Sequence, residues 1–358
     1  IAFLPKYKYN KGEFAINAGA STINRTINMS NSSSGTIDTY NYNGRTISVD
    51  AFNKYKFSKK LFIVIGTQYQ YVDMTQKDAY TNVTREGAKF NLIDPYATLV
   101  YNSDFGLNIN AGARFNTHGE YGNQMVYNFN PSFSFESIPL KVLTSYSTAY
   151  ITPSLYQLYG PYGNLDLTPE ENATAEFGFE TQLLDKKLTI NIVGFYREEE
   201  NTIGFYTNPL TFFSSYINVS GTYNAKGVEA SVRYILSERF NIGGNYTFTQ
   251  VEEELNRLIP KHKGNIDFNY QFKRGTFGVT YQYLNQRSDA YYDSNIWATA
   301  PVELPAYQLI NSTMSYDLLP KRLQIFGAVN NIFNDDFQEA IGYNSRGRNY
   351  KMGFNFLF

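Results

Sequence analysis

The chain has 358 residues, and its 31 basic and 32 acidic residues leave a formal net charge of -1. This balance gives no support for nucleic-acid binding, and the lack of cysteine excludes disulfides, thiolate metal sites and cysteine nucleophiles. Aromatic residues make up 17% of the chain, yet no apolar run approaches the roughly 20 residues of a membrane-spanning helix. Two classes remain, a transmembrane β-barrel and a soluble all-β protein.

Alternation of apolar and polar residues predicts β-strands along the chain. Clear examples in chain order are 47–57, 104–116, 127–136, 228–234, 239–249 and 265–272. In the second of these, the apolar residues from Phe105 to Phe115 share one face, and polar residues that include Arg114 share the other. The predicted strands exceed the roughly six residues usual in soluble sheets. Their length suits tilted strands that cross the hydrocarbon of a membrane.

The connections between these strands alternate between short and long. The short ones lie near 10–12, 58–60, 102–104, 137–139, 185–187, 237–239, 273–275 and 318–322. The long ones lie near 21–44, 74–88, 117–123, 151–170, 198–224, 251–262, 286–306 and 334–345. Outer-membrane barrels have short periplasmic turns and long outer loops, whereas a soluble sandwich has no reason to alternate. The pattern predicts a transmembrane antiparallel β-barrel with about 17 strands in this chain.

An odd number of antiparallel strands places the two chain ends on opposite sides of the membrane. Single-chain bacterial barrels usually have an even number, with both ends in the periplasm, and a missing strand would expose an unpaired edge to lipid. We therefore expect earlier strands to be absent from this chain. The last strand carries Phe354, Phe356 and Phe358 on one face. It resembles the signal read by the barrel-assembly machinery, so we expect the natural C-terminus here.

Two segments resemble TonB-dependent outer-membrane receptors. The first, 145–180, holds PSLYQLYG at 153–160, GN at 163–164, LTPE at 167–170 and EFG at 176–178. The second, 327–358, holds VNNIF at 329–333 and GRNY at 347–350. The resemblance implies a barrel of about 22 strands that is closed by an N-terminal plug domain. Residues 1–358 would then be the C-terminal part of the barrel. The plug and the first strands would belong to the same protein or to a separate chain.

The resemblance implies a receptor in the bacterial outer membrane that takes up a scarce small molecule, with energy from TonB acting through the plug. The QLYG, YGN and TPEE pieces look most like vitamin B12 (cobalamin) receptors, although iron–siderophore receptors share the barrel. A passive porin, or a barrel that presents its loops to a surface lipoprotein, is the alternative. The two histidines, His118 and His262, lie far apart in sequence and form no metal triad or nucleophile relay, so we predict no enzyme.

Candidate ligand-binding residues are the aromatic side chains of the outer loops, because ligand sites combine apolar walls with a few polar groups. They are Tyr159, Tyr162, Phe205, Tyr206, Tyr291, Tyr292 and Trp297. Interfacial girdles or loop packing would also explain them.

Two further groups of charged residues are candidates. Asp289 and Asp293 are weak calcium candidates, since calcium takes about six to eight oxygens and two carboxylates supply too few. No other cofactor is expected. Lumen-facing charges could form ion pairs with the plug, or simply be solvated; these are Asp50, Arg114, Glu180, Glu229 and Arg233.

Overall fold

The computed structural model describes residues 2–31, 34–79, 81–208, 210–211, 213–252, 257–293, 295–296 and 298–357. Nineteen strands belong to one antiparallel sheet, and two hairpins form small sheets of their own. The described residues include one five-residue helix, α1 (Leu155–Tyr159). Across these ranges, no helix has the length and apolar character needed to cross a bilayer.

The chain forms two compact units. The first unit comprises Ile1–Ser132, Ser145–Thr174 and Glu198–Thr222, and the second comprises Phe133–Thr144, Ala175–Arg197 and Tyr223–Phe358. Five strands contribute residues to both units: β15 (Thr222–Ile235), of which only Thr222 belongs to the first unit, and four others. The four others are β9 (Gly122–Ser134), β10 (Leu140–Ile151), β11 (Glu170–Leu183) and β12 (Leu188–Glu200).

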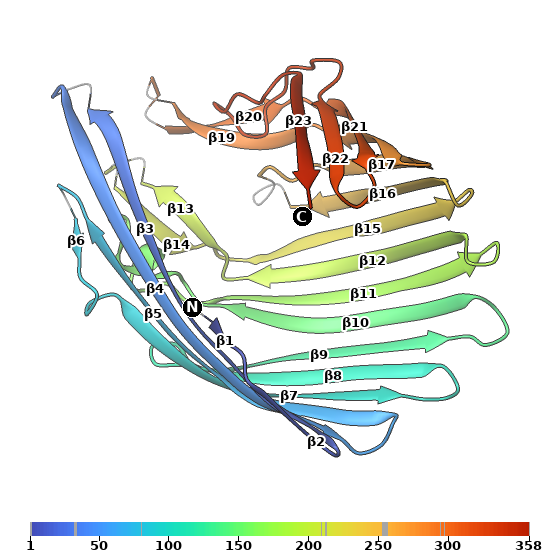
Figure 1. Ribbon diagram of the computed structural model, residues 1–358. Coiled ribbons are helices and arrows are strands. Elements are labelled where there is room, and N and C mark those ends of the chain that lie inside the picture. The colour runs from blue at the N-terminus through green and yellow to red at the C-terminus, as the bar shows by residue number, and fades with distance from the viewer. Residues whose placement is uncertain are drawn as a thin grey trace. The chain divides into compact units, whose positions relative to one another are not determined.

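The first unit is a meander of long strands (Figure 1). β1 (Ala2–Phe3) and β2 (Lys6–Tyr9) pair with successive parts of β3 (Gly12–Asn31), so they act as one strand interrupted at Pro5, which lacks an amide hydrogen. The meander continues through β4 (Thr36–Lys56), β5 (Leu61–Lys77), β7 (Lys89–Asn102) and β8 (Leu107–His118). β6 (Asn82–Val83) pairs with the end of β5. The hairpin of β13 (Ile203–Thr207) and β14 (Ser214–Asn218) completes the unit.

The second unit is also an antiparallel meander. Its strands are β15 (Thr222–Ile235), β16 (Phe240–Val251), β17 (His262–Phe272), β18 (Gly275–Leu284), β21 (Tyr307–Leu319), β22 (Leu323–Asn330) and β23 (Asn349–Phe356). Between β18 and β21 lies a separate hairpin of β19 (Arg287–Asp293) and β20 (Ala298–Leu304).

The strand number agrees with the prediction. β1 and β2 form a single interrupted strand and β6 has two residues, so the nineteen strands of the sheet correspond to about 17 long ones. The predicted loop at 21–44 is wrong, because β3 and β4 continue through it to Asn31 and from Thr36. Polar cross-strand pairs hold this extension, among them Thr26 with Asn41 at 2.9 Å and Thr39 with Asn28 at 3.0 Å.

The strands have one polar and one apolar face. In the first unit Asp50, Gln68 and Asp94 stand side by side on the polar face, while Val49, Tyr69 and Ile93 do so on the apolar face. Buried apolar side chains are few among the described residues: Ala15, Ala88, Leu155, Leu158, Leu167, Tyr223 and Leu304. Instead the apolar face is exposed, as at Met352 and Phe354 of β23, which are 86% and 71% exposed. A soluble protein would bury such rows, whereas lipid can cover them.

Candidate ligand-binding site

Five aromatic rings lie in succession in the first unit, and we call them the aromatic cluster. The ring centroids are 6.3 Å apart for Tyr42 and Tyr156, and 6.4 Å apart for Tyr156 and Tyr216. The series continues from Tyr216 to Phe205 at 5.3 Å and from Phe205 to Tyr162 at 5.4 Å. These separations fall in the range that aromatic pairs prefer. The cluster joins β4, α1, β13, β14 and the segment after α1.

A capping box positions the helix that carries Tyr156. The Ser154 hydroxyl accepts a hydrogen bond from the Gln157 amide at 3.3 Å, and the Gln157 side chain accepts one from the Ser154 amide at 2.8 Å. Leu155 and Leu158 are buried and anchor the helix. Tyr156 is therefore held on a short but well-capped helix.

Polar residues of the family-like segment hold the β13–β14 hairpin in place. Asn164 donates to the Tyr216 carbonyl at 2.9 Å, and the Thr168 amide donates to the Asn218 side chain at 2.8 Å. The Glu170 carboxylate accepts a hydrogen bond from the Ile203 amide at 2.6 Å. The GN and TPE pieces at 163–164 and 168–170 therefore form the architecture that brings Phe205 and Tyr216 to the cluster.

An apolar cavity of about 540 Å³ adjoins the aromatic cluster. Its lining residues are Ile23, Arg25, Ile27, Tyr42, Asn43, Gly44, Met74, Thr75 and Tyr156. In the strand register, Ile23, Gly44 and Met74 stand side by side, on the same face as Asp50. Ile23 is 70% exposed on this otherwise polar face. Exposed apolar residues in such a setting indicate a binding surface.

Among the described residues that line the cavity, Arg25 alone is charged at neutral pH. Burial raises the pKa of Tyr156, and its tyrosine neighbours raise it further; burial also raises the pKa of Tyr216. Both hydroxyls therefore stay protonated at neutral pH and can donate hydrogen bonds. The guanidinium of Arg25 supplies a positive charge at the cavity. This arrangement can hold a ligand with a flat or apolar body and a negatively charged group.

The predicted ligand residues divide between the two units. Tyr162 and Phe205, which the sequence placed in different loops, are in contact. Tyr159 ends α1, and Tyr206 is exposed at the next position of β13 after Phe205. Tyr291 and Tyr292 lie on β19 in the second unit, and Trp297 lies outside the described residues. The sequence missed Tyr42, Tyr156 and Tyr216.

The two weak calcium candidates have different hydrogen-bond partners. Asp289 is buried, and its carboxylate accepts hydrogen bonds from Arg257 Nε at 2.9 Å and from the Ala290 and Ile341 amides at 2.8 Å. Burial would raise the pKa of Asp289, but these donors outweigh burial and lower it. Asp293 instead accepts from the Asn295 amide. The described part of the chain holds no group of three or more acidic, histidine or cysteine side chains suited to a metal.

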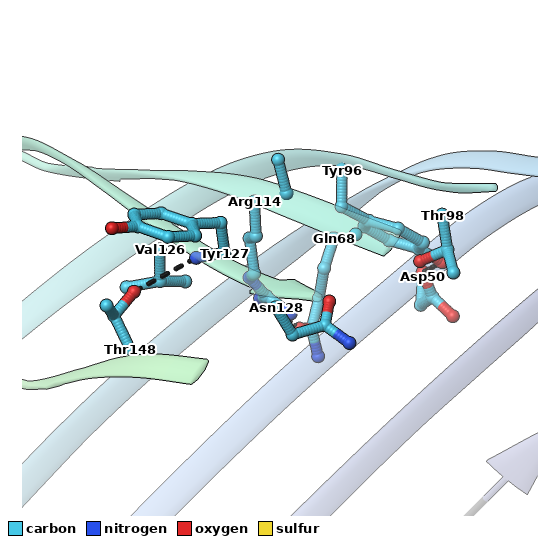
Figure 2. Close-up of a pocket in the computed structure, with 11 residues that line it drawn as sticks. Asp50, Gln68, Tyr96, Thr98, Arg114, Val126, Tyr127, Asn128 and Thr148 are labelled. Atoms are coloured by element: carbon cyan, nitrogen blue, oxygen red, sulfur yellow. Dashed lines mark hydrogen bonds between the residues drawn. The ribbon is translucent and has the colours of Figure 1, made fainter. Parts of the chain in front are cut away.

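Two of the predicted lumen charges meet at a second cavity, of about 340 Å³, in the first unit (Figure 2). The Tyr96 hydroxyl donates to Asp50 at 2.8 Å. The Arg114 guanidinium donates to Asp94 at 2.6 Å and to Gln68 at 2.5 Å. These partners form a polar wall with both charge signs.

The other lumen charges lie on strands of the second unit. In the register of β15 and β16, Glu229 stands beside Thr247 and Arg233 beside Gly243. They alternate with the exposed Val228 and Val232, so they lie on the polar face. Glu180 follows Phe179 on β11 and is half-buried, whereas Phe177 and Phe179 are exposed on the opposite face.

Comparison with known proteins identifies the family. Residues 4–332 match the family described as TonB dependent receptor-like, beta-barrel. The Vitamin B12 transporter BtuB of Vibrio cholerae serotype O1 (strain M66-2) is 29% identical over 255 residues, which are 70% of this chain and 40% of that protein. The same values hold for the transporter of strain ATCC 39541 / Classical Ogawa 395 / O395. The chain thus spans about two fifths of the length of these curated relatives.

Solved structures show the same fold. The copper transporter OprC superposes with a TM-score of 0.83 at 12% identity, covering 100% of this chain and 64% of that one. The siderophore receptor PirA from Acinetobacter baumannii gives a TM-score of 0.79 at 15% identity, covering 99% and 61%. These relatives are transporters and receptors rather than enzymes. The chain therefore belongs to the TonB-dependent receptor-like β-barrel family, whose members reside in the bacterial outer membrane.

Proposed function

We propose that the whole protein is an outer-membrane receptor that takes up a scarce ligand of the cobalamin or iron–siderophore type, with energy coupled through TonB. The observation that carries this proposal is the aromatic cluster beside an apolar cavity on an otherwise polar face. The named B12 transporters and the siderophore receptor support the two ligand types.

The chemistry of the site suits such ligands. The rings of Tyr42, Tyr156 and Phe205 offer faces and edges for a flat ligand, and stacking contacts of this kind contribute roughly 0.5–1.5 kcal/mol each beyond area burial. Arg25 would pair with a negative group of the ligand. We assign ligand capture to this site.

The cavity around Asp50 and Arg114 is our proposed contact for a plug domain. It presents a carboxylate, a guanidinium and a Tyr96 hydroxyl on the polar face. A plug segment with complementary charges would dock there and be released when TonB pulls on the plug. A large lumen is commonly filled in this way.

The test is ligand binding by the purified full-length protein. Equilibrium dialysis with cyanocobalamin and with a ferric catecholate siderophore distinguishes the two ligand types. Phe205→Ala should weaken binding roughly tenfold, since it removes one ring and its stacking. Tyr206→Ala is the matched control, because Tyr206 is the next residue of the same strand and its side chain points to the opposite face. Equal losses in both variants, or no binding of either probe at micromolar concentration, would contradict the proposal.

Planar-bilayer recording separates the receptor from a passive porin. A plugged receptor should give no steady conductance as purified, whereas a porin conducts continuously. Co-purification with a surface lipoprotein, without binding of either small molecule, would instead favour a barrel that presents its loops to a protein partner.

A further inference from the structure

Two arginines share one buried carboxylate on the apolar face of the first unit. Arg45 lies 2.6 Å from Asp73, and Arg85 lies 2.8 Å from the other carboxylate oxygen. The Asp73 side chain is fully buried, while the side chains of Arg45 and Arg85 are 38% and 43% exposed. Arg45 comes from β4, Asp73 from β5 and Arg85 from the connection that precedes β7. We call these three residues the arginine pair site.

The register places this site at the edge of the membrane. Arg45 pairs with Asp73, and the next pair on the same face is Ile47 with Tyr71. The Arg45 guanidinium lies 5.6 Å from the centre of the Tyr71 ring. Tyr55 lies near the other end of β4. With a rise of about 3.3 Å per residue and a tilt of about 45°, the strand climbs roughly 23 Å between Tyr55 and Arg45. That height matches the apolar band of about 25 Å in outer-membrane barrels.

The site carries an excess of positive charge. One arginine would neutralise Asp73, so the second guanidinium is left over. Lys89 stands opposite Asp73 in the β5–β7 register and is exposed. Glu86, in the same connection as Arg85, is exposed and balances only part of this charge. Cations at headgroup level attract the phosphates of anionic lipids, and a guanidinium can bind a phosphate through two parallel hydrogen bonds.

We propose that Arg45 and Arg85 bind the phosphate group of an anionic lipid in the outer leaflet, from the membrane side of the sheet. The buried Asp73 holds the two guanidinium groups beside each other, and the Tyr71 ring supports the one from Arg45. Arg45 and Asp73 lie on the face opposite to Ile23, Gly44 and Met74 of the apolar cavity. Arg85 also donates a hydrogen bond to Asn43, a residue of the cavity wall, at 2.6 Å.

The test is native mass spectrometry of the full-length protein released from nanodiscs that contain phosphatidylglycerol and phosphatidylcholine. The wild type should retain phosphatidylglycerol preferentially. Replacing the two arginines alone would leave the buried Asp73 carboxylate without a cation. The test variant therefore combines Arg45→Gln, Asp73→Asn and Arg85→Gln. Its affinity for phosphatidylglycerol should fall roughly fivefold, because the three substitutions together remove one net positive charge. Retention within twofold of the wild type would overturn the proposal.

Two controls make the result specific. Lys59→Gln with Lys60→Gln removes two positive charges from the turn between β4 and β5, a larger change in net charge than in the test variant, and this variant should still retain the lipid. An equal loss there would show general attraction and contradict a built site. Inorganic phosphate at the same concentration should not displace the lipid; displacement would indicate a free-anion site and overturn the lipid assignment. Arg85→Lys in the otherwise unchanged protein keeps the positive charge, so this variant should retain more of the lipid than the triple variant does.

Discussion

We expect Ile266→Arg to destabilise the protein in lipid by roughly 2–4 kcal/mol, the cost of an arginine at the membrane midplane on the lipid side of a barrel. Ile266 is the fifth residue of the eleven in β17, so it lies near mid-membrane, and it is 52% exposed on the apolar face. In a soluble protein, a half-exposed isoleucine would accept arginine with little change in stability. The assay is reversible unfolding by guanidinium from lipid vesicles, with the free energy of unfolding compared between variants.

Asn265→Arg is the matched control on the neighbouring position. Asn265 lies on the polar face and donates a hydrogen bond to Asn245 at 3.1 Å, whose loss is worth about 1 kcal/mol. We therefore expect this variant to lose no more than that. Equal destabilisation by the two substitutions, or a neutral Ile266→Arg, would refute the assignment of the apolar face to lipid.

Three further predictions concern packing, pH and the helix cap. Gly66→Val should cost about 1–3 kcal/mol of unfolding free energy, because a Cβ there would lie 2.6 Å from the Tyr96 side chain. The pKa of Asp289 is lowered, so its contribution to stability is present above the usual value of 3.8 and is lost as pH falls below it; pepsin should then cut the β19–β20 hairpin faster. Ser154→Ala should weaken α1 by about 1 kcal/mol and lower ligand affinity through Tyr156.

Each of these has its own control. Gly44→Ala should be tolerated, since no atom lies within 4 Å of the added Cβ; similar losses at both glycines would count against the packing argument. Asp289→Asn should remove the pH dependence of cleavage, and an unchanged profile would contradict the role of the carboxylate. Ser154→Thr keeps a capping hydroxyl and should retain ligand affinity; a loss equal to that of Ser154→Ala would exclude the cap as the cause.

Alternation was sufficient to predict the sheet, because each lipid-crossing strand needs one apolar face. The prediction failed for the parts of β3 and β4 outside the membrane, where a strand needs no apolar face towards lipid. In the extension of β3 and β4, Thr and Asn occupy the face that carries Val49 further along the sheet, and their cross-strand pairs are held by hydrogen bonds. A run rich in Asn, Ser and Thr is typical of a loop, which is why the sequence predicts one at 21–44.

The candidate site was predicted in part. Tyr162 and Phe205 were singled out as loop aromatics, but their contact depends on hydrogen bonds from Asn164 and Glu170 that no local pattern reveals. Tyr42 lies in a predicted outer loop but was not singled out, because no local pattern shows that it meets Tyr156 of α1. The hydrogen-bond partners of Asp289 could not be predicted either, because two of its donors lie at the distant positions 257 and 341.

The most direct test of the account uses the absence of cysteine from the chain. Single cysteines are placed in turn at positions 264 to 270 of β17, and the full-length protein in lipid vesicles is treated with a water-soluble maleimide. We expect fast reaction at 265, 267 and 269 and protection at 264, 266, 268 and 270, because the first set contacts water and the second contacts lipid. Equal rates along the strand, or the opposite alternation, would contradict it.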